Sequence, residues 1–404
     1  MSDSNKCFDY IVIGSGIVGL SVAYALLQKN PKIKIAVLEK ENDLGMHASG
    51  RNSGVLHSGI YYREDSLKAK VCALGATRIK LFAKEKNIPL FNGGKVIVPT
   101  ELDQYPTLDN LMQNASANGI EAEIIDQKQL LELEPLAFPA EKSIYCPGTS
   151  VIDNKAVLNK LRQILEEHGV KLIYQCEVYK VFSSKKSVLT TQGEYQYQYL
   201  FNCAGAYADQ IAKYEGLAQD YTLLPFKGIY YKMTAESASK IKSNIYPVPN
   251  IATPFLGVHF TRSIHGDVYI GPTAIPVLGR ENYHGLKGVS FFETLELILQ
   301  LGKLFCSNEN DFRNIAKNEL MKYSKNVFYQ CAKKLVPSLE IDDLITCSKA
   351  GIRPQLMNKK TKKLEMDYIF EQTSSSIHVL NAISPAFTSS FAFADMIVDK
   401  ANIN

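Results

Sequence analysis

The sequence lacks the marks of several large protein classes. Its eight cysteines form no CxxC pair and no Cys/His cluster with zinc spacing, so we expect reduced thiols and neither a disulfide framework nor a metal site. Its 45 basic and 41 acidic residues nearly balance, which leaves no concentrated basic face for nucleic acid. Low-complexity tracts and internal repeats are also missing. The 404 residues therefore indicate an ordinary globular protein of about two domains.

Only one apolar run approaches the length of a membrane span, from Tyr10 to Leu27. Lys6 is the only positive side chain before it, and no typical signal-peptide cleavage site follows it. Gly14, Gly16 and Gly19 interrupt the run in a pattern with a better explanation. We therefore expect a cytoplasmic protein without a membrane span, and we leave open a peripheral contact with the inner membrane.

The stretch FDYIVIGSGIVGLSVAYALL predicts a strand, a tight turn and a helix. Its apolar, β-branched start is typical of a strand buried on both faces. The three glycines then form GxGxxG, in which the first permits the turn, the second lets a pyrophosphate approach and the third lets helix and strand pack closely. The amino end of the helix would face the phosphates. The pattern predicts a dinucleotide-binding fold.

A second predicted strand, KIKIAVLEK, contains Glu39, 20 residues after Gly19. This is the spacing at which an acidic residue binds the ribose hydroxyls of a dinucleotide. Glu39 would also repel the extra phosphate of NADP. The chain then enters a glycine-rich loop, residues 48–62, instead of another βαβ unit. Such a loop suits a long cofactor whose ring system lies deep in the protein, so the sequence favours FAD over NAD.

The rest of the chain predicts an α/β protein with a discontinuous Rossmann-like domain and a mixed α+β domain. Helical patterns cover residues 66–87, 102–118 and 127–134, and further helical stretches lie between 291 and 335. The first pattern predicts an apolar face with Leu67, Val71, Leu74 and Leu81. Strands rich in aromatic and β-branched residues begin at about residue 223. We assign residues 1–88, 146–220 and 340–404 to the FAD-binding domain, and residues 89–145 and 221–339 to the substrate-binding domain.

Several motifs, taken together, resemble a known family. In chain order they are IGSGIVGLSVAYAL with LEK, GRNSGVLHSGIYY, SLKAK, IYPVPN with PFLGVHFTR, GDVYIGP, GIRPQ and HVLNAISPAFTSS. Over residues 9–399 the chain is similar to the L-2-hydroxyglutarate dehydrogenases and oxidases, which are FAD oxidoreductases of the glycine-oxidase-like or D-amino-acid-oxidase-like kind. The resemblance implies bound FAD, an antiparallel sheet over the flavin, and oxidation of an L-2-hydroxy acid, above all L-2-hydroxyglutarate, to the 2-oxo acid by hydride transfer to flavin N5.

The resemblance also implies which residues contact the cofactor besides Glu39. They lie in the first turn, after the second strand, in the glycine-rich loop, at later strand ends and in the C-terminal loop. They are Gly14, Gly16, Gly19, Lys40, Ser49, Asn52, Ser53, Gly54, Val178, Ala204, Gly205, Gly351, Pro385, Ala386, Thr388 and Ser389.

The chemistry of such an oxidation needs a fixed cation for the carboxylate and an acceptor for the hydroxyl proton. Arg353 is our candidate for the cation, because the planar guanidinium binds a carboxylate in two places. His57 and His259 are the candidate proton acceptors, because imidazole titrates near neutral pH. His57 is favoured because it lies inside the glycine-rich loop.

A dicarboxylic substrate needs a second cation, because a buried unpaired charge is costly. Lys227 and Arg262 are the candidates in the substrate domain, and Lys227 stands where relatives usually have arginine. Tyr62 and Tyr246 are further candidates for substrate contact, although packing is the commoner role of a tyrosine.

Three alternatives stay open at this point. An amine or amino-acid oxidase of the same fold would use the same cofactor grip, and a glycerol-3-phosphate dehydrogenase would need a phosphate site. A flavin-binding protein without catalysis is the alternative from another class. The electron acceptor, whether oxygen, a quinone or a carrier protein, is left open by the sequence.

Overall fold

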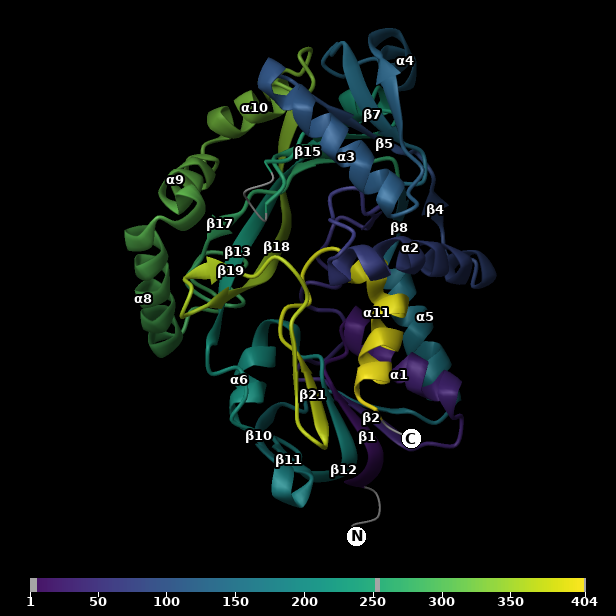
Figure 1. Ribbon diagram of the computed structural model, residues 1–404, viewed down its shortest axis with the longest axis vertical. Coiled ribbons are helices and arrows are strands. Elements are labelled where there is room, and N and C mark those ends of the chain that lie inside the picture. Colours follow the sequence, from purple (N-terminus) through teal and green to yellow (C-terminus); the bar gives the residue numbers. More distant parts are fainter. Residues whose placement is uncertain (1–5, 251–254, 403–404) are drawn as a thin grey trace.

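The computed structural model describes residues 6–250 and 255–402, and Figure 1 shows it as a ribbon. Two large sheets meet along a central cavity. Pro254, with which the quoted stretch PFLGVHFTR begins, lies outside the described residues.

The first sheet carries the dinucleotide turn. Its centre is parallel, with β1 between β12 and β2, then β9 beyond β2 and β21 beside β12. The strands are β1 (Cys7–Ile13), β2 (Ile35–Leu38), β9 (Lys171–Ile173), β10 (Val178–Phe182), β11 (Ser187–Thr190), β12 (Gly193–Asn202), β20 (Phe370–Gln372) and β21 (Ser376–Val379). Val12 packs on one face of the sheet, and Ile11 and Ile13 pack on the other. The apolar run of β1 is therefore buried on both faces, as predicted.

Four helices pack around the first of these two faces, at the lower right of Figure 1. They are α1 (Ile17–Lys29), α2 (Leu67–Glu85), α5 (Asn154–Glu167) and α11 (Ala386–Lys400). The short helix α6 (Ala208–Lys213) lies on the opposite side of the sheet. Helices α2 and α11 approach closely at Gly75, where a Cβ atom would come within 2.5 Å of Ser389 Cα. The C-terminal helix is thereby built into the cofactor domain, as the discontinuous fold predicts.

The second sheet is larger and mostly antiparallel. Its longest pairing joins β13 (Tyr221–Met233) to β18 (Leu344–Asn358), with Gly228 opposite Gly351 and Phe226 opposite Arg353. The other strands are β5 (Lys95–Val98), β6 (Glu123–Asp126), β7 (Lys142–Cys146), β14 (Asn244–Pro247), β15 (His259–Arg262), β16 (Val268–Gly271), β17 (Ile275–Pro276) and β19 (Lys363–Leu364). A third, small sheet joins β3 (Val55–Leu56), β4 (Leu90–Phe91) and β8 (Ser150–Ile152).

The helices of the second domain lie around its sheet. They are α3 (Tyr105–Ala117), α4 (Gln127–Leu133), α7 (Ala235–Ser239), α8 (Phe291–Ser307), α9 (Phe312–Met321) and α10 (Lys325–Lys333). Helices α8, α9 and α10 form the outer flank of the molecule, at the left of Figure 1. Among the residues that the structure describes, no helix is long and apolar enough to cross a membrane.

Two sequence expectations about elements were wrong. Residues 340–404 were assigned to the FAD-binding domain, but β18 and β19 belong to the sheet of the second domain because β18 pairs with β13 along most of its length. In α2 the predicted apolar face included Leu74 and Leu81, and both side chains are exposed. The helix instead buries Val71, Ile79 and Phe82, because α11 packs against the neighbouring face.

Candidate active site

The turn between β1 and α1 can form only with glycine. Gly14 has φ +98°, and a Cβ atom there would lie 2.6 Å from the backbone oxygen of Cys203. A Cβ atom on Gly19 would lie 2.0 Å from the oxygen of Gly14, so this residue serves helix–strand packing. Gly16 is the N-cap of α1 without a side-chain cap, and the first turn has no acidic residue. The positive end of the helix therefore suits a phosphate in the cavity that Gly14 and Gly16 line.

Glu39 directly follows β2 and is held firmly at the cavity wall. One carboxylate oxygen accepts hydrogen bonds from the backbone N–H and the hydroxyl of Ser15, at 2.8 and 2.7 Å. The other accepts the N–H of Glu41 at 3.0 Å. Carboxylate oxygens can accept further hydrogen bonds, so the fixed carboxylate fits a ribose hydroxyl pair.

Hydrogen bonds hold the glycine-rich loop against α1 and α11. Ser49 Oγ accepts the first N–H of α1 at 2.9 Å. Asn52 donates to the backbone oxygen of Ser49 at 2.7 Å and accepts the N–H of Gly54 at 2.8 Å. The backbone N–H of His57 donates to Thr388 Oγ1 in α11 at 3.1 Å. The loop is thus ordered by its own polar side chains, and its glycines leave room for a ligand along the cavity.

The two candidate histidines line the same cavity. His259 Nδ1 donates to the backbone oxygen of Gly257 at 2.8 Å, so in the neutral ring Nε2 carries the free lone pair. Burial lowers the pKa of His259 to about 4, the Gly257 hydrogen bond opposes this effect, and Arg353 and Lys95 lower the pKa by smaller amounts. Burial, followed by Lys95, His259 and Arg353, lowers the pKa of His57 to about 3. Both imidazoles are therefore neutral proton acceptors at physiological pH.

Arg353 lies on β18 and lines the cavity two residues after Gly351. Burial lowers the pKa of its guanidinium, which nevertheless keeps its charge at any physiological pH. Its charge acts on Tyr62 and Tyr230, and both phenols also line the cavity. Burial raises the pKa of both phenols, so they are neutral hydrogen-bond donors beside a buried cation.

The cavity itself runs from the dinucleotide turn to Arg353 and has a volume of about 1200 Å³. Single small-molecule pockets are commonly about 300–1,000 Å³, so there is room for a long cofactor and a small substrate. The structure brings most of the predicted cofactor residues to its wall. They are Gly14, Gly16, Glu39, Lys40, Ser49, Asn52, Ser53, Val178, Ala204, Gly205, Gly351, Pro385, Ala386 and Thr388.

Three predicted cofactor residues lie behind this wall. Gly19 packs the turn, as described above, and Gly54 has φ +77°, where a Cβ atom would lie 2.5 Å from the oxygen of Ile152. Ser389 is fully buried in α11, against Gly75 of α2. These positions shape the backbone and do not contact the cavity.

Three predicted substrate residues, the cations Lys227 and Arg262 and also Tyr246, do not lie at the cavity, contrary to expectation. Lys227 alternates with Phe226 and Gly228 along β13, so those two line the cavity and the lysine points to the other face. Its Nζ lies 5.9 Å from the ring centre of Tyr323, beyond α9. The Arg262 guanidinium donates to the backbone oxygen of Ile241 and is likewise absent from the cavity wall.

Two buried lysines were missed from the sequence. Lys68, in the motif SLKAK, lines the cavity and was interpreted only as part of a helix. Lys95 has no exposed surface, and its Nζ lies 3.4 Å from the Tyr61 hydroxyl. The same Nζ lies 5.3 Å from the ring centre of Tyr246, which stacks on His259 with ring centres 4.0 Å apart. Tyr246 therefore packs against His259 and does not line the cavity. The sequence signal that could have revealed Lys95 is a charged residue at the start of the apolar run KVIVP.

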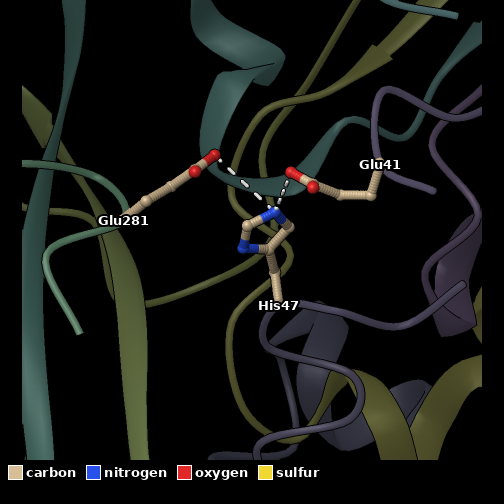
Figure 2. A group of neighbouring side chains, drawn as sticks. All are labelled: Glu41, His47 and Glu281. Carbon is tan, nitrogen blue, oxygen red and sulfur yellow. Dashed lines mark hydrogen bonds and ion pairs between the residues drawn. The ribbon is translucent and has the colours of Figure 1, made fainter. Parts of the chain in front are cut away.

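A cluster of charged and polar side chains, formed by Lys40, Glu41, His47 and Glu281, lies near the end of the cavity that Glu39 lines. His47 lies between the carboxylates of Glu41 and Glu281, with Nε2 2.9 and 3.6 Å from their oxygens (Figure 2). The geometry of the three side chains would allow a metal ion, but Lys40 Nζ is bonded to both carboxylates and supplies the positive charge. Burial lowers the pKa of Lys40, but Glu281 and Glu41 outweigh it and raise that pKa overall. The cluster therefore joins the loop after β2 to the segment before α8.

A dinucleotide turn, a fixed carboxylate at the end of the second strand and a cavity between two sheets define a dinucleotide-dependent oxidoreductase. Comparisons with known proteins specify the class. The family described as FAD dependent oxidoreductase (DAO) matches residues 9–400. The chain therefore belongs to the family of FAD dependent oxidoreductases, and its cofactor is FAD.

Curated relatives cover nearly the whole chain. The L-2-hydroxyglutarate dehydrogenase of Indibacter alkaliphilus is 36% identical over 399 residues, 98% of each chain. The human mitochondrial L-2-hydroxyglutarate dehydrogenase is 34% identical over 422 residues, 99% of this chain and 89% of the relative. The enzyme of that name from Escherichia coli strain K12 is 35% identical over 404 residues, 97% and 93% of the two chains.

Solved structures share the fold. The FAD-bound L-α-glycerophosphate oxidase of Mycoplasma pneumoniae superposes with a TM-score of 0.78 at 23% identity, covering 98% of this chain and 95% of that one. Glycine oxidase of Geobacillus kaustophilus gives a TM-score of 0.71 at 16% identity, covering 98% and 94%. At these identities the likeness establishes the fold, including the predicted pairing of a Rossmann-like domain with an antiparallel sheet.

Proposed function

We propose that this enzyme oxidises L-2-hydroxyglutarate to 2-oxoglutarate. The observation that carries the proposal is the composition of the cavity beside Arg353: a partly buried guanidinium, a buried ammonium on Lys68, and the neutral imidazoles of His57 and His259. Cations attract carboxylates, and neutral imidazoles accept a hydroxyl proton. The names of the curated relatives support the same substrate.

Arg353 holds the carboxylate next to the reacting carbon, because its two parallel N–H groups fix both oxygens and thereby the orientation of the carbon. His57 accepts the proton of the substrate hydroxyl, and His259 is the alternative acceptor. The turn, Glu39 and the C-terminal loop would hold FAD, whose ring would supply an acceptor for two electrons when the cofactor is bound.

The low pKa of His57 fits this role. In the free protein burial comes first, and the cations Lys95 and Arg353 also act on the ring, so a proton there is unfavourable. A bound dianion neutralises part of that repulsion and raises the pKa of the imidazole, which makes it a stronger base when substrate is present. The resting enzyme is thus kept ready to accept a proton.

Anaerobic reduction of the bound flavin tests the function. L- and D-2-hydroxyglutarate, L-malate, L-lactate, glycerol 3-phosphate, glycine and sarcosine are compared side by side by loss of the flavin absorbance. We expect the fastest loss with L-2-hydroxyglutarate. Faster loss with an amine would make the protein an amine oxidase, and no loss with any compound would favour a non-catalytic flavoprotein.

We also propose that α8 lies on a membrane surface. Phe291 and Phe292 at its start are 77% and 83% exposed, and Glu296 and Lys303 are exposed at the edge of the same apolar face. Its other exposed apolar residues are Leu295, Ile298, Leu299 and Phe305. A helix that presents so much apolar surface is typical of attachment to the lipid interface. The proposal concerns peripheral contact only.

The position of α8 favours a quinone among the three electron acceptors that the sequence leaves open. Leu297 and Leu304, on its buried face, pack in one cluster with Phe226 and Phe255. Those two rings also line the cavity. The apolar wall of the cavity is therefore one layer of side chains from the exposed face of α8, which suits an acceptor dissolved in lipid.

A further inference from the structure

Lys68 carries a nearly buried ammonium group in the cavity. It is the second residue of α2 and only 6% exposed, yet it lines the cavity. Its Nζ lies 5.7 Å from the ring centre of Tyr62 and 5.9 Å from that of Tyr368. Within residues 6–250 and 255–402 no oxygen accepts a hydrogen bond from this Nζ and no carboxylate pairs with it. The aromatic rings of Tyr62 and Tyr368 are therefore its close neighbours.

The acid that acts on Lys68 electrostatically is already engaged. Asp367 accepts the backbone N–H of Leu67 at 2.6 Å and that of Lys68 at 3.0 Å. Ser66 Oγ accepts the N–H of Ala69 at 3.1 Å. The amino end of α2 therefore has its own partners within the protein. The Lys68 ammonium has no such partner among the described residues. A buried charge without a partner is costly unless a ligand of opposite charge pairs with it.

We propose that Lys68 binds the distal carboxylate of a dicarboxylic 2-hydroxy acid whose first carboxylate is held by Arg353. This inference rests on the proposed function and names the residue that selects the substrate. It replaces Lys227 and Arg262, which lie away from the cavity. Two cations at a fixed separation recognise chain length as well as charge, because only a chain of the right length reaches both.

The electrostatics agree with this arrangement. Burial, and next the charge of Arg353, lower the pKa of Lys68 to about 8. The amine is therefore protonated at neutral pH. Lys68 and Arg353 line the same cavity together with Tyr62, whose ring centre lies 5.7 Å from Lys68 Nζ. A dianion placed between the two cations would be attracted by both charges at once.

Two substrates that differ only at the far end test the proposal. L-2-hydroxyglutarate and L-2-hydroxypentanoate share the chain length and the hydroxy-acid end, but the second has a methyl group in place of the distal carboxylate. In the holoenzyme, Lys68→Met should raise KM for L-2-hydroxyglutarate about 10- to 100-fold and change KM for L-2-hydroxypentanoate less than about twofold, the effect of one lost charge-assisted hydrogen bond. Lys70→Met is the matched control, because Lys70 is exposed on the same helix.

A measurement on the wild type covers the case in which Lys68→Met does not fold. Glutarate and pentanoate are compared as competitive inhibitors across pH. Glutarate should lose affinity as pH rises through about 8, where Lys68 loses its proton, more steeply than pentanoate does. Equal pH dependence of the two inhibitors would overturn the proposal.

The outcomes separate the two proposals. Equal rises in KM for both substrates, or an altered flavin reduction potential with an unchanged KM ratio, would mean that Lys68 serves the fold or the cofactor and not the distal carboxylate. Wild-type enzyme would still oxidise L-2-hydroxyglutarate in either case. Failure of the proposed function would instead appear as a wild-type flavin that no hydroxy acid reduces.

Discussion

His57 and His259 differ in how they are held, and this difference can be tested at the level of single residues. His57→Gln should keep FAD but slow anaerobic flavin reduction by about 10²–10⁴-fold, the usual loss when a general base is removed. His259→Gln should have the smaller effect, because its Nδ1 proton is committed to Gly257 and its ring to Tyr246. Stopped-flow reduction measures both.

His265→Gln is the matched control, since that imidazole is exposed and away from the cavity. Should the His259 variant alone slow reduction, the two histidines exchange roles. If neither slows it, the proton leaves by another route and the site must be reconsidered.

Lys95 gives a prediction about pH. It acts, together with Arg353, on both histidines and helps to hold their pKa values at about 3 and 4. In the wild type kcat/KM should therefore show no acid limb above about pH 5, because both rings are already neutral there. Lys95→Met removes a positive neighbour, so protonation of His57 becomes less unfavourable and its pKa rises. The acid limb should therefore lie at higher pH in the variant than in the wild type, and still below the ordinary histidine value of about 6.5 because burial remains.

The comparison uses pH profiles of kcat/KM for wild type and variant. Lys70→Met, an exposed lysine on α2, controls for the change in net charge. Identical acid limbs in the wild type and Lys95→Met would show that Lys95 does not set the protonation of these rings.

At the level of elements, α8 is the least expected feature. An amphipathic helix normally turns its apolar face inward. Here Leu297 and Leu304 are buried while Phe291 and Phe292 face outward. Phe291→Ser/Phe292→Ser should weaken binding to phosphatidylethanolamine/phosphatidylglycerol vesicles by about tenfold or more, because burying each phenyl ring is worth about 1.5–3 kcal/mol.

Co-sedimentation with the vesicles measures this, and flavin reduction by substrate should be unchanged. Leu102→Ser is the control, because Leu102 is 84% exposed but lies far from α8 in the sequence and outside its apolar face. A wild type that stays in the supernatant, or a double variant that sediments like the wild type, would contradict the proposal.

At the level of the whole molecule, the cavity that would hold FAD lies between the two sheets, so a bound cofactor should hold them together. FAD binds the folded protein only, so saturating FAD should raise the melting temperature, and the gain reaches about 4 kcal/mol at a thousandfold excess over Kd. Glu39→Gln should reduce that gain, because a neutral amide binds the ribose hydroxyls less strongly than a carboxylate does.

Calorimetry with increasing FAD measures the shift, and Glu64→Gln, an exposed acid, is the control. Equal FAD-induced shifts in wild type and Glu39→Gln would mean that Glu39 supports the turn through Ser15 but does not hold the ribose.

The sequence by itself determined the cofactor half of this protein. The turn at Gly14, the strand before it and Glu39 after the next strand are local features, and local sterics and short spacing dictate their structure. The full-length resemblance carried the family and FAD, which the comparisons confirm.

Tertiary structure alone decided the substrate half. Lys68 and Lys95 come from a helix and a strand far apart from Arg353 in the sequence, and no spacing rule connects them. Lys227 looked equally suitable, but the alternation of side chains along β13 turns it away from the cavity. Residues 344–364 belong to the second sheet because β18 pairs with β13, which lies more than a hundred residues earlier in the sequence. A charged side chain gains its role from what surrounds it after folding, and that environment is assembled from distant segments of the chain.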